Sequence, residues 1–297
     1  MPEKITVVGS INMDLVTSTD RMPEQGETIL GENFAVIPGG KGANQAVAAA
    51  KLGAYVHFIG RVGSDVFGGR LITHMKEQGV STDDLEQVSD EPSGTASIIL
   101  AEQDNRIIVV PGANNTVTPE VVAAREDVIA ESDIMLLQLE IPLESAVKAA
   151  ELAAAHDTTV ILNPAPMQDL PKALLDNVDY FTPNEHELLP LFQNEPDASI
   201  YHSRCVMTKG ADGVLFTEDN KERHIPGYPV EPVDTTGAGD TFNGALAAAL
   251  TRNVPLPEAC RFANAAAALS VQKMGAQGGM PMQHEVENFL KNKQDRS

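Results

Sequence analysis

The stretch at 233–240 reads Val-Asp-Thr-Thr-Gly-Ala-Gly-Asp and precedes a predicted helix of small and aliphatic residues at 241–250. Gly237 and Gly239 permit a tight turn whose backbone N–H groups stay free. Free N–H groups at the positive end of a helix dipole form a site for an anion such as phosphate. Asp240 places a negative charge within this site, which leaves two interpretations. Either Asp240 caps the helix, or it takes a proton from a hydroxyl that attacks a phosphoryl group.

A second glycine-rich stretch, Gly-Gly-Lys-Gly-Ala-Asn-Gln at 39–45, precedes a helix predicted at 46–52. Its spacing matches neither the phosphate-binding loop G-x-x-x-x-G-K-[ST] nor the dinucleotide fingerprint G-x-G-x-x-G. Glycines let a backbone approach a ligand closely, and Lys41 and Asn44 can donate hydrogen bonds to it. The stretch is therefore either a ligand-binding loop or a flexible loop that caps the helix.

Asn12 and Asp14 follow a buried strand predicted at 5–9. If the chain stays extended, these two side chains point to one side and Met13 points to the other. An amide beside a carboxylate can hold the neighbouring hydroxyl groups of a polyol. The alternative is a turn closed by side-chain hydrogen bonds.

The elements that must position these residues alternate between strand and helix over most of the chain. This pattern predicts an α/β fold with a mostly parallel central sheet covered by helices on both faces. Predicted strands lie at 5–9, 55–60, 134–139, 159–162, 179–182, 204–208 and 213–216. Predicted helices lie at 46–52, 67–78, 119–130, 143–155, 171–176, 184–192, 240–251, 257–273 and 283–291.

Ligands of such sheets bind at the carboxyl ends of the strands. Polar side chains follow the predicted strands at these ends, and this shared placement predicts a binding site. They are Asn12, Asp14, Glu140, Asn163, Asn184 and Glu187.

Two segments lack helices between their strands. One carries short strands at 28–30 and 34–37, and the other a hairpin of 95–100 with 106–110 around Asp104-Asn105. They predict a small separate sheet, inserted from about 12–40 and 93–113 into a single domain that spans 1–297.

The composition excludes several classes of function. Lys and Arg number 21 and Asp and Glu 42, which gives a net charge of −21 and disfavours nucleic acids and anionic membranes as partners. Cys205 and Cys260 are too few and too far apart for a disulfide framework or a zinc site, so we expect reduced core residues. No signal peptide and no apolar run of about 20 residues is found, which leads us to expect a cytoplasmic protein.

Together, the two glycine-rich stretches closely resemble those of the ribokinase (phosphofructokinase-B) family of sugar kinases. The resemblance extends from Gly9-Ser10-Ile11-Asn12 to Gly275-Ala276-Gln277. It implies a ribokinase-like fold whose small β-sheet is a lid that pairs two subunits into a homodimer. It also implies transfer of phosphate from ATP to the 5-hydroxyl of D-ribose, which gives D-ribose 5-phosphate and ADP.

The same resemblance implies the roles of single residues. Asp240 would be the general base, and the amides of Gly237, Ala238 and Gly239 would form the anion hole for the transferred phosphoryl group. The residues implied to hold the ribose are Asn12, Asp14, Gly40, Lys41, Asn44 and Glu140. Those implied to line the nucleotide are Thr208, Lys209, Gly210, Gly213, Gly239 and, at the adenine edge, Asn264.

Two cations are implied as well. Asn184 and Glu187 match an Asn-x-x-Glu element that supports Mg²⁺ and phosphate binding. A monovalent cation such as K⁺ would be framed, largely by backbone oxygens, by Asp234, Thr236, Ser270, Lys273, Gly275 and Gly279.

Alternatives stay open at this stage. Glu140 can be a charge at a strand end, and Asn264 an ordinary helix residue. The connection at 193–203 is shorter than in the family, which predicts that a peripheral helix is missing or replaced by a loop. The acceptor can be another small sugar or nucleoside, such as deoxyribose, fructose or adenosine. A non-catalytic sugar-binding regulator on the same fold is the other class of function, although the retention of Asp240 argues against it.

Overall fold

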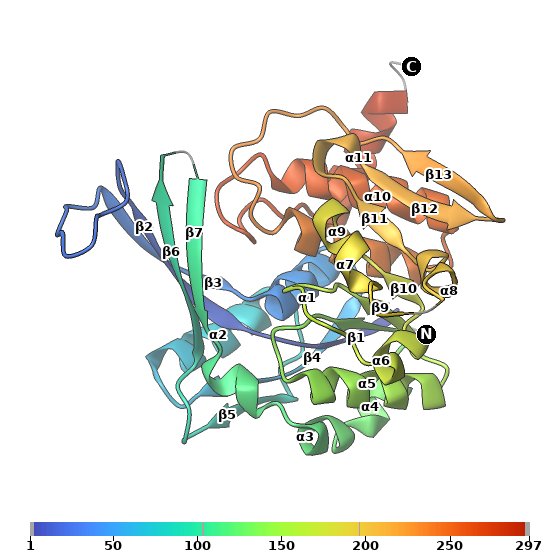
Figure 1. Ribbon diagram of the computed structural model, residues 1–297, viewed down its shortest axis with the longest axis horizontal. Helices are drawn as coiled ribbons and strands as arrows, with labels where there is room; N and C mark the ends of the chain where they lie inside the picture. Colours follow the sequence, from blue (N-terminus) through green and yellow to red (C-terminus); the bar gives the residue numbers. More distant parts are fainter. Residues whose placement is uncertain (1–2, 103, 196, 295–297) are drawn as a thin grey trace.

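A parallel sheet forms the centre of the computed structural model, which describes residues 3–102, 104–195 and 197–294. Its strands lie in the order β10-β9-β8-β1-β4-β5, and every neighbouring pair is parallel (Figure 1). The carboxyl ends therefore share one edge of the sheet. The strands are β1 (Lys4–Val8), β4 (Tyr55–Gly63), β5 (Leu85–Val88), β8 (Ile134–Leu137), β9 (Thr159–Leu162) and β10 (Tyr180–Phe181).

Helices cover both faces because the strands are apolar on both sides. In β1, Ile5 and Val7 belong to one hydrophobic cluster and Val8 to the other, as the predicted fold class requires. One face packs against α1 (Lys41–Lys51), α2 (Val66–Glu77), α9 (Ala238–Leu250), α10 (Leu256–Ser270) and α11 (Gln283–Gln294). The other packs against α3 (Pro119–Ala123), α4 (Glu126–Ala130), α5 (Leu143–Ala155), α6 (Lys172–Asp176), α7 (Glu185–Leu191) and α8 (Ser199–His202).

A second sheet extends the first beyond β10. It consists of β11 (Val206–Thr208), β12 (Val214–Glu218) and β13 (Lys221–Ile225), all antiparallel. It adjoins the end of β10 through parallel bridges of Phe181 with Cys205 and of Asn184 with Thr208. The sequence did not predict β13, which is mostly polar and exposed. The loop predicted at 193–203 is also wrong in part, because α8 lies there and its Tyr201 stacks on Phe192.

The small separate sheet is confirmed. It has the order β3-β2-β6-β7 and projects from the body as an arm (Figure 1). Its strands are β2 (Asn12–Ser18), β3 (Asn33–Gly39), β6 (Gly94–Ala101) and β7 (Asp104–Val110). The strand predicted at 28–30 is wrong, since pairing begins only at Asn33 with Ser18 and Leu30 is 93% exposed. Asp104 pairs with Ala101 inside the hairpin, so Asp104-Asn105 belongs to β7 and not to the turn.

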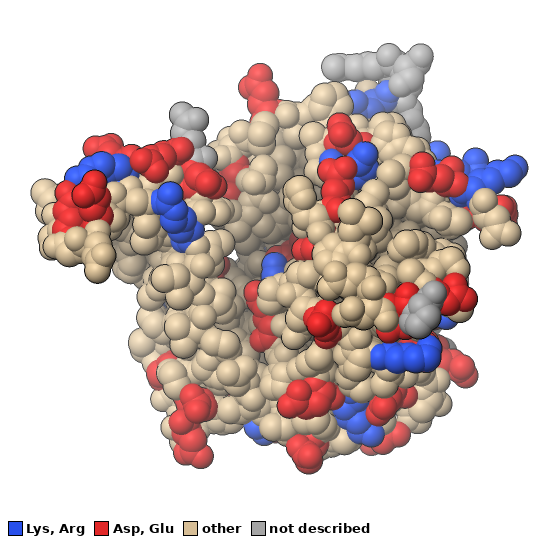
Figure 2. All heavy atoms as spheres, in the orientation of Figure 1, with Lys and Arg blue, Asp and Glu red and all other residues tan. Residues whose placement is uncertain are grey.

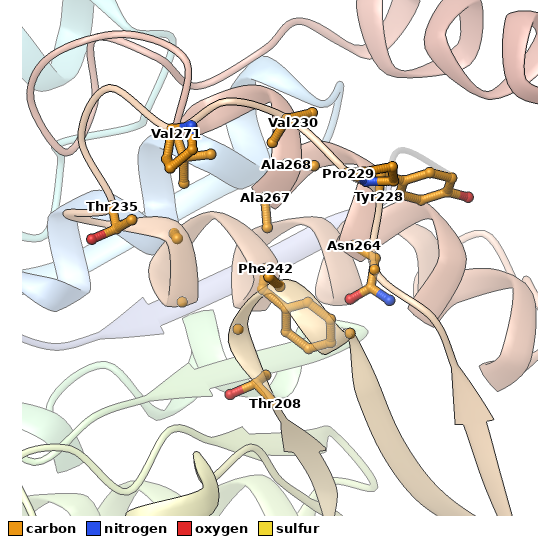
Figure 3. A pocket seen from close by; sticks show the side chains of 17 residues that line it. Thr208, Tyr228, Pro229, Val230, Thr235, Phe242, Asn264, Ala267, Ala268 and Val271 are labelled. Atoms are coloured by element: carbon orange, nitrogen blue, oxygen red, sulfur yellow. The ribbon is translucent and has the colours of Figure 1, made fainter.

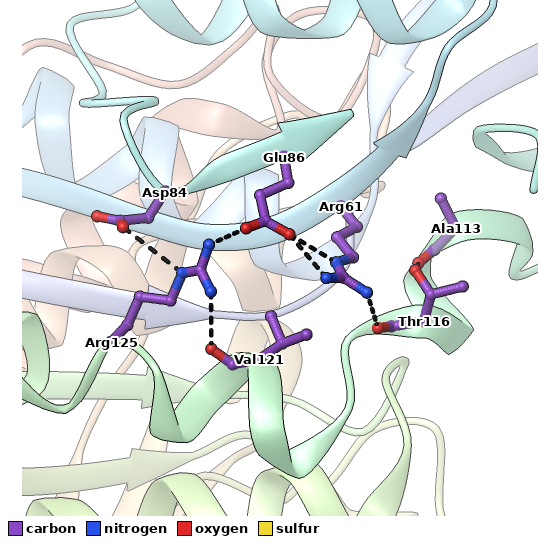
Figure 4. Close-up of polar contacts among 7 residues, drawn as sticks. All are labelled: Arg61, Asp84, Glu86, Ala113, Thr116, Val121 and Arg125. Atoms are coloured by element: carbon purple, nitrogen blue, oxygen red, sulfur yellow. Dashed lines mark hydrogen bonds and ion pairs between the residues drawn. The ribbon is translucent and has the colours of Figure 1, made fainter. Parts of the chain in front are cut away.

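Two arginines fasten the edge strand β5 to the body. Arg61 donates to one carboxylate oxygen of Glu86 at 2.9 and 2.7 Å, and Arg125 donates to the other (Figure 4). Arg61 also donates to the carbonyl of Thr116 at 2.6 Å in the short helix η1 (Gly112–Thr116). The backbone of Arg125 leaves the helical region at φ −117° and ψ 24°, which divides the helix predicted at 119–130 into α3 and α4.

The described helices and cysteines agree with the expectations from composition. None of the helices in the described part of the chain combines the length and apolar character needed to cross a bilayer. Cys205 and Cys260 are free and buried, and burial raises the pKa of both thiols to about 12.

Helix α1 begins at Lys41, earlier than the predicted 46–52, because Gly39 ends β3 and Gly40, with φ 91°, is the N-cap. Residues 41–45 therefore form its first turn and not a loop. α1 crosses α9 at Gly244, where a Cβ atom would lie 2.6 Å from the carbonyl oxygen of Gln45 and 2.6 Å from the Cβ of Ala48. The absence of a side chain at Gly244 lets the first turns of the two helices meet.

The crossing yields a prediction about stability. We expect Gly244→Ala to lower the free energy of unfolding by about 1–3 kcal/mol, because the new methyl group must push the helices apart. Gly69→Ala is the matched control: it lies in α2, is exposed, and a Cβ built there would have no atom within 4 Å. It should raise stability by about 0.5–1 kcal/mol through helix propensity. Urea unfolding of both variants measures this, and equal effects would contradict the close crossing.

Candidate active site

Asp240 lies in the first turn of α9 and is only 8% exposed. The N-cap of α9 is Gly237, in the left-handed conformation with φ 75°, so the interpretation of Asp240 as a cap is wrong. Asn44 donates through Nδ2 to Asp240 Oδ2 at 2.9 Å, and Gln45 donates through Nε2 to Oδ1 at 3.1 Å. Two consecutive side chains of α1 thus hold the two carboxylate oxygens.

The surroundings of Asp240 raise the pKa of its carboxyl group. Burial has the largest effect; Lys41 and the hydrogen bonds from Asn44 and Gln45 lower the pKa, and Glu140 raises it further. A carboxylate of raised pKa accepts a proton more readily, which suits a general base.

The turn ahead of Asp240 offers backbone N–H groups to an anion. Within the described residues, no hydrogen bond engages the N–H of Gly237 or Gly239, while that of Ala238 donates to the carbonyl of Thr235 at 3.2 Å. Gly239 borders open space, with no atom within 4 Å of a Cβ built there. The geometry supports an anion site at Gly237 and Gly239 and leaves the N–H of Ala238 engaged.

Two further carboxylates approach Asp240 from the lid and from the end of β8. Burial raises the pKa of Asp14 to about 7, helped by the negative charges of Glu140 and Asp240. Glu140 Oε2 accepts hydrogen bonds from Ser10 Oγ at 2.6 Å and from the backbone N–H of Lys41 at 3.2 Å. Figure 2 shows a hollow between lid and body with acidic and basic side chains at its bottom.

Lys41 supplies the positive charge among these carboxylates. Burial alone would lower the pKa of its ammonium group, but Asp240, Glu140 and Glu187 outweigh that effect and the pKa is raised. Lys41 therefore stays charged and can donate to a ligand hydroxyl.

Asn12 is buried, and its orientation is set by a neighbour. Asn114 Nδ2 donates to Asn12 Oδ1 at 2.7 Å, and Asn114 Oδ1 accepts from the N–H of Ile11 at 3.0 Å. The Nδ2 group of Asn12 is left for a ligand. Gly40 packs against this backbone, where a Cβ would lie 2.8 Å from the N of Asn12. The turn alternative for Asn12 and Asp14 is wrong, because both lie in β2 and Met13 points into the core.

A second hollow, of about 300 Å³, lies on the other side of the Gly237–Gly239 turn (Figure 3). Phe242 of α9 lies against it, and Asn264 of α10 stands at one end. Asn264 donates through Nδ2 to the carbonyl of Ile225 at 3.2 Å, which leaves its Oδ1 free to accept. The sequence-predicted residues that line this cavity are Thr208, Gly210, Gly213, Gly239 and Asn264. Lys209 does not line it and instead forms an ion pair with Glu185 at 3.4 Å.

Asn184 and Glu187 form a capping box at the start of α7. Asn184 Oδ1 accepts from the N–H groups of His186 and Glu187, and Glu187 Oε2 accepts from the N–H of Asn184 at 2.8 Å. The Asn-x-x-Glu pattern therefore has a structural role in any case. It leaves one oxygen of Glu187 and the Nδ2 group of Asn184 for other partners.

The residues proposed for the monovalent cation lie in two segments, 234–236 and 270–279. The carboxylate of Asp234 connects these segments by hydrogen bonds. Its two oxygens accept from the N–H of Thr236 at 2.9 Å and of Gly275 at 2.8 Å. Burial would raise the pKa of Asp234, but these hydrogen bonds lower it overall. Gly279 approaches the carbonyl of Ser270 so closely that a Cβ at Gly279 would clash with that oxygen. Lys273 is exposed on the same turn.

Several residues of the site were missed by sequence reasoning. Gln45 follows Asn44 in the same stretch and could have been included with it, and Asn114 lies in a polar Gly-Ala-Asn-Asn turn. Gln138 is fully buried beside Gln45, but nothing in the sequence separates it from the other polar residues.

Residues 2–283 match the model of the pfkB family carbohydrate kinases. The chain is 48% identical to a ribokinase from Bacillus subtilis (strain 168), over 96% of this chain and 99% of that protein. It is 35% identical to a deoxyribokinase from Salmonella typhi, over 96% of this chain and 98% of that protein.

Two solved structures are similar to this chain over almost its whole length. A ribokinase from Arabidopsis thaliana complexed with ribose and ATP is 35% identical, with a TM-score of 0.91 and coverage of 98% of this chain and 99% of that one. A ribokinase from Thermotoga maritima is 38% identical, with a TM-score of 0.88 and coverage of 97% and 99%.

The electrostatics of the site can be measured without a ligand. We expect the Asp14 carboxyl group to titrate near pH 7 in ¹³C NMR spectra. Glu140→Gln should lower the pKa of Asp14, because it removes a nearby negative charge. Glu144→Gln, the same substitution at an exposed position of α5, should leave it unchanged. A pKa near the ordinary value of 3.8 in the wild type would show that Asp14 lies apart from the other carboxylates.

Proposed function

The chain belongs to the pfkB family of carbohydrate kinases, and from this premise we propose that it transfers the γ-phosphoryl group of ATP to the 5-hydroxyl of D-ribose. One observation carries the chemistry: a buried carboxylate, Asp240, lies directly beyond a turn whose Ala238 and Gly239 line an open cavity. We therefore place the reacting hydroxyl beside Asp240 and the phosphoryl group beside the Gly237–Gly239 turn.

In this reaction Asp240 accepts the proton of the 5-hydroxyl as its oxygen attacks. The N–H groups of Gly237 and Gly239, joined by Ala238 once its N–H leaves Thr235, stabilise the charge on the transferred group. The raised pKa of Asp240 makes it a stronger base.

We propose that the acceptor lies between the lid and α1. Asn12 and Asp14 hold its 2- and 3-hydroxyls, and Lys41, Asn44 and Glu140, with the backbone of Gly40, hold the remaining oxygens. The free Nδ2 group of Asn12 and the charged Lys41 supply donors, and the carboxylates supply acceptors. Ribose is favoured because this set pairs with vicinal hydroxyls, and the ribokinase from Bacillus subtilis is the more similar of the two relatives described above.

ATP fits the apolar cavity, with the adenine near Asn264 and the phosphates toward Gly239. Thr208, Gly210 and Gly213 border the nucleotide in this proposal, whereas Lys209, which is paired with Glu185, does not. Among the described residues no group of three or more His, Cys, Asp or Glu side chains is placed to hold a metal ion. We propose that Mg²⁺, which keeps several waters and binds phosphates, has Asn184 and Glu187 as outer contacts. When bound, Mg²⁺ neutralises charge on the phosphates.

We also propose that K⁺ binds beside the anion site, among Asp234, Thr236 and backbone oxygens of Ser270, Lys273, Gly275 and Gly279. The ionised Asp234 and the close approach of Gly279 to a carbonyl oxygen fit a monovalent cation. Activity in K⁺ buffer compared with Na⁺ buffer tests this, and equal rates would refute it.

Two subunits would pair through their lids. The lid has an open edge at β7, where Ile107, Ile108 and Val110 are 49%, 67% and 51% exposed. Pairing would cover this edge, and a monomer mass by light scattering would contradict it. The proposal includes a cytoplasmic location, because the reaction consumes ATP.

The assignment of the base leads to a prediction. Asp240→Asn should lower kcat for ribose phosphorylation by about 10²–10⁴-fold, because an amide cannot accept the proton. The variant should remain folded and bind an ATP analogue with unchanged affinity, measured by calorimetry. Turnover near that of the wild type would remove Asp240 from the mechanism.

The proposed contacts with the sugar lead to a prediction about the choice of acceptor. D-Ribose should exceed 2-deoxyribose at least tenfold in kcat/KM, because loss of one hydroxyl leaves a buried partner unpaired at a cost of about 1–3 kcal/mol. A tenfold ratio requires about 1.4 kcal/mol. Asp14→Ala should narrow this ratio in a coupled assay with both sugars. Equal efficiency on both sugars in the wild type would indicate a deoxyribose kinase or a broader enzyme.

A further inference from the structure

A chain of hydrogen bonds leads from Asp240 to a histidine outside the site. Asn44 donates to Asp240 at 2.9 Å, Gln277 Nε2 donates to Asn44 Oδ1 at 2.9 Å, and His74 Nε2 lies 2.6 Å from Gln277 Oε1. His74 belongs to α2, and Gln277 to the turn after α10. Residues from three distant parts of the sequence therefore act on one carboxylate.

The ionised carboxylate of Asp240, at one end of this series of hydrogen bonds, determines the direction of each of them. An ionised carboxylate only accepts, so Asn44 must present its NH₂ group to Asp240 and its oxygen to Gln277. Gln277 must in turn donate to that oxygen and offer its own oxygen to His74. His74 closes the chain as a donor through Nε2. If Gln277 were removed, Asn44 would lose the donor that fixes its oxygen, and its NH₂ group would hold the carboxylate of Asp240 less firmly.

The turn that carries Gln277 is fixed on both sides. Lys51 of α1 donates to the carbonyls of Gln277 and Met280, each at 3.4 Å, and Asp234 holds the N–H of Gly275. The turn also lies against the anion site, since a Cβ on Gly237 would meet the Cβ of Ala276 at 2.8 Å. Gln277 is 6% exposed and thus buried in a rigid setting.

We propose that Gln277, held by His74, is a positioning residue that keeps the amide of Asn44 turned toward the catalytic base. This inference rests on the proposed function of Asp240. Gln277 contributes to the reaction through Asn44 and not through contact with substrate.

The test compares Gln277→Met with wild type. The variant keeps the volume of the side chain and removes both hydrogen bonds, so kcat should fall about tenfold while KM for ribose and ATP changes less than about twofold. Gln272→Met, an exposed position near the same turn, should match the wild type.

The pH profile separates positioning from a general loss of structure. Asp240 is surrounded by Lys41, Asn44 and Gln45 on α1, by Glu140, and by Asp14 on β2. A donor to a carboxylate lowers its pKa, so losing the donor should move the acidic limb of kcat to higher pH. ¹³C titration of the Asp240 carboxyl group should show the same upward shift without any substrate.

His74 supplies the second variant, in case Gln277→Met does not fold. His74→Phe should shift both readouts in the same direction by a smaller amount, and His74→Gln, which restores a donor, should return them toward the wild type. An unchanged kcat and an unchanged Asp240 titration in a folded Gln277→Met or His74→Phe variant would overturn the inference. Failure of the wild type to phosphorylate ribose would instead refute the proposed function, and the ¹³C titration would still decide the role of Gln277.

Discussion

The burial of the Asp240 carboxylate is the constraint on which the rest of this site depends. A buried charge is costly unless hydrogen bonds and an opposite charge compensate it. Here two neighbouring amides of α1 and the ammonium group of Lys41 do so. All three come from the first turn of one helix, so α1 must meet α9 at close range. Gly244 makes that approach possible, because a side chain there would meet the backbone of Gln45 and the side chain of Ala48.

The Gly237–Gly239 turn separates a group of carboxylates on one side from free backbone N–H groups on the other. On the side proposed for the acceptor, the carboxylates of Asp14, Glu140 and Asp240 lie near the ammonium group of Lys41. On the phosphate side, attraction comes from backbone N–H groups and a helix dipole. In a chain with a net charge of −21, this arrangement draws an anionic nucleotide by local dipoles where the overall field would repel it.

Sequence reasoning predicted the features that local patterns encode. Alternating apolar strands gave the central sheet, and the glycine turns located Asp240 and its neighbours. The features it missed depend on contacts between distant residues. Gln277 meets Asn44 across 233 positions, and no local signal distinguishes it from an exposed glutamine such as Gln272. Likewise, the break at Arg125 arises where that side chain reaches Glu86 on another strand. The sequence also left open whether Asp240 caps its helix, because the N-cap is determined by the left-handed backbone of Gly237.

Two of the residues proposed to bind the acceptor belong to the lid, and this has a mechanical consequence. Asn12 and Asp14 belong to β2, a strand of the lid, whereas Asp240 belongs to α9 in the body. Asn114 pins Asn12 and the backbone of Ile11 at the point where the chain passes from β1 into β2. Gly39 lies so close to Asp14 that a Cβ there would clash with its carboxylate, so the two lid strands carry Asp14 as one unit. Any change in the angle of the lid therefore moves Asn12 and Asp14, the groups proposed to bind hydroxyls, relative to Asp240. An acceptor bound to the lid residues would reach Asp240 only when the lid lies against the body, which links binding of the sugar to the geometry of proton transfer.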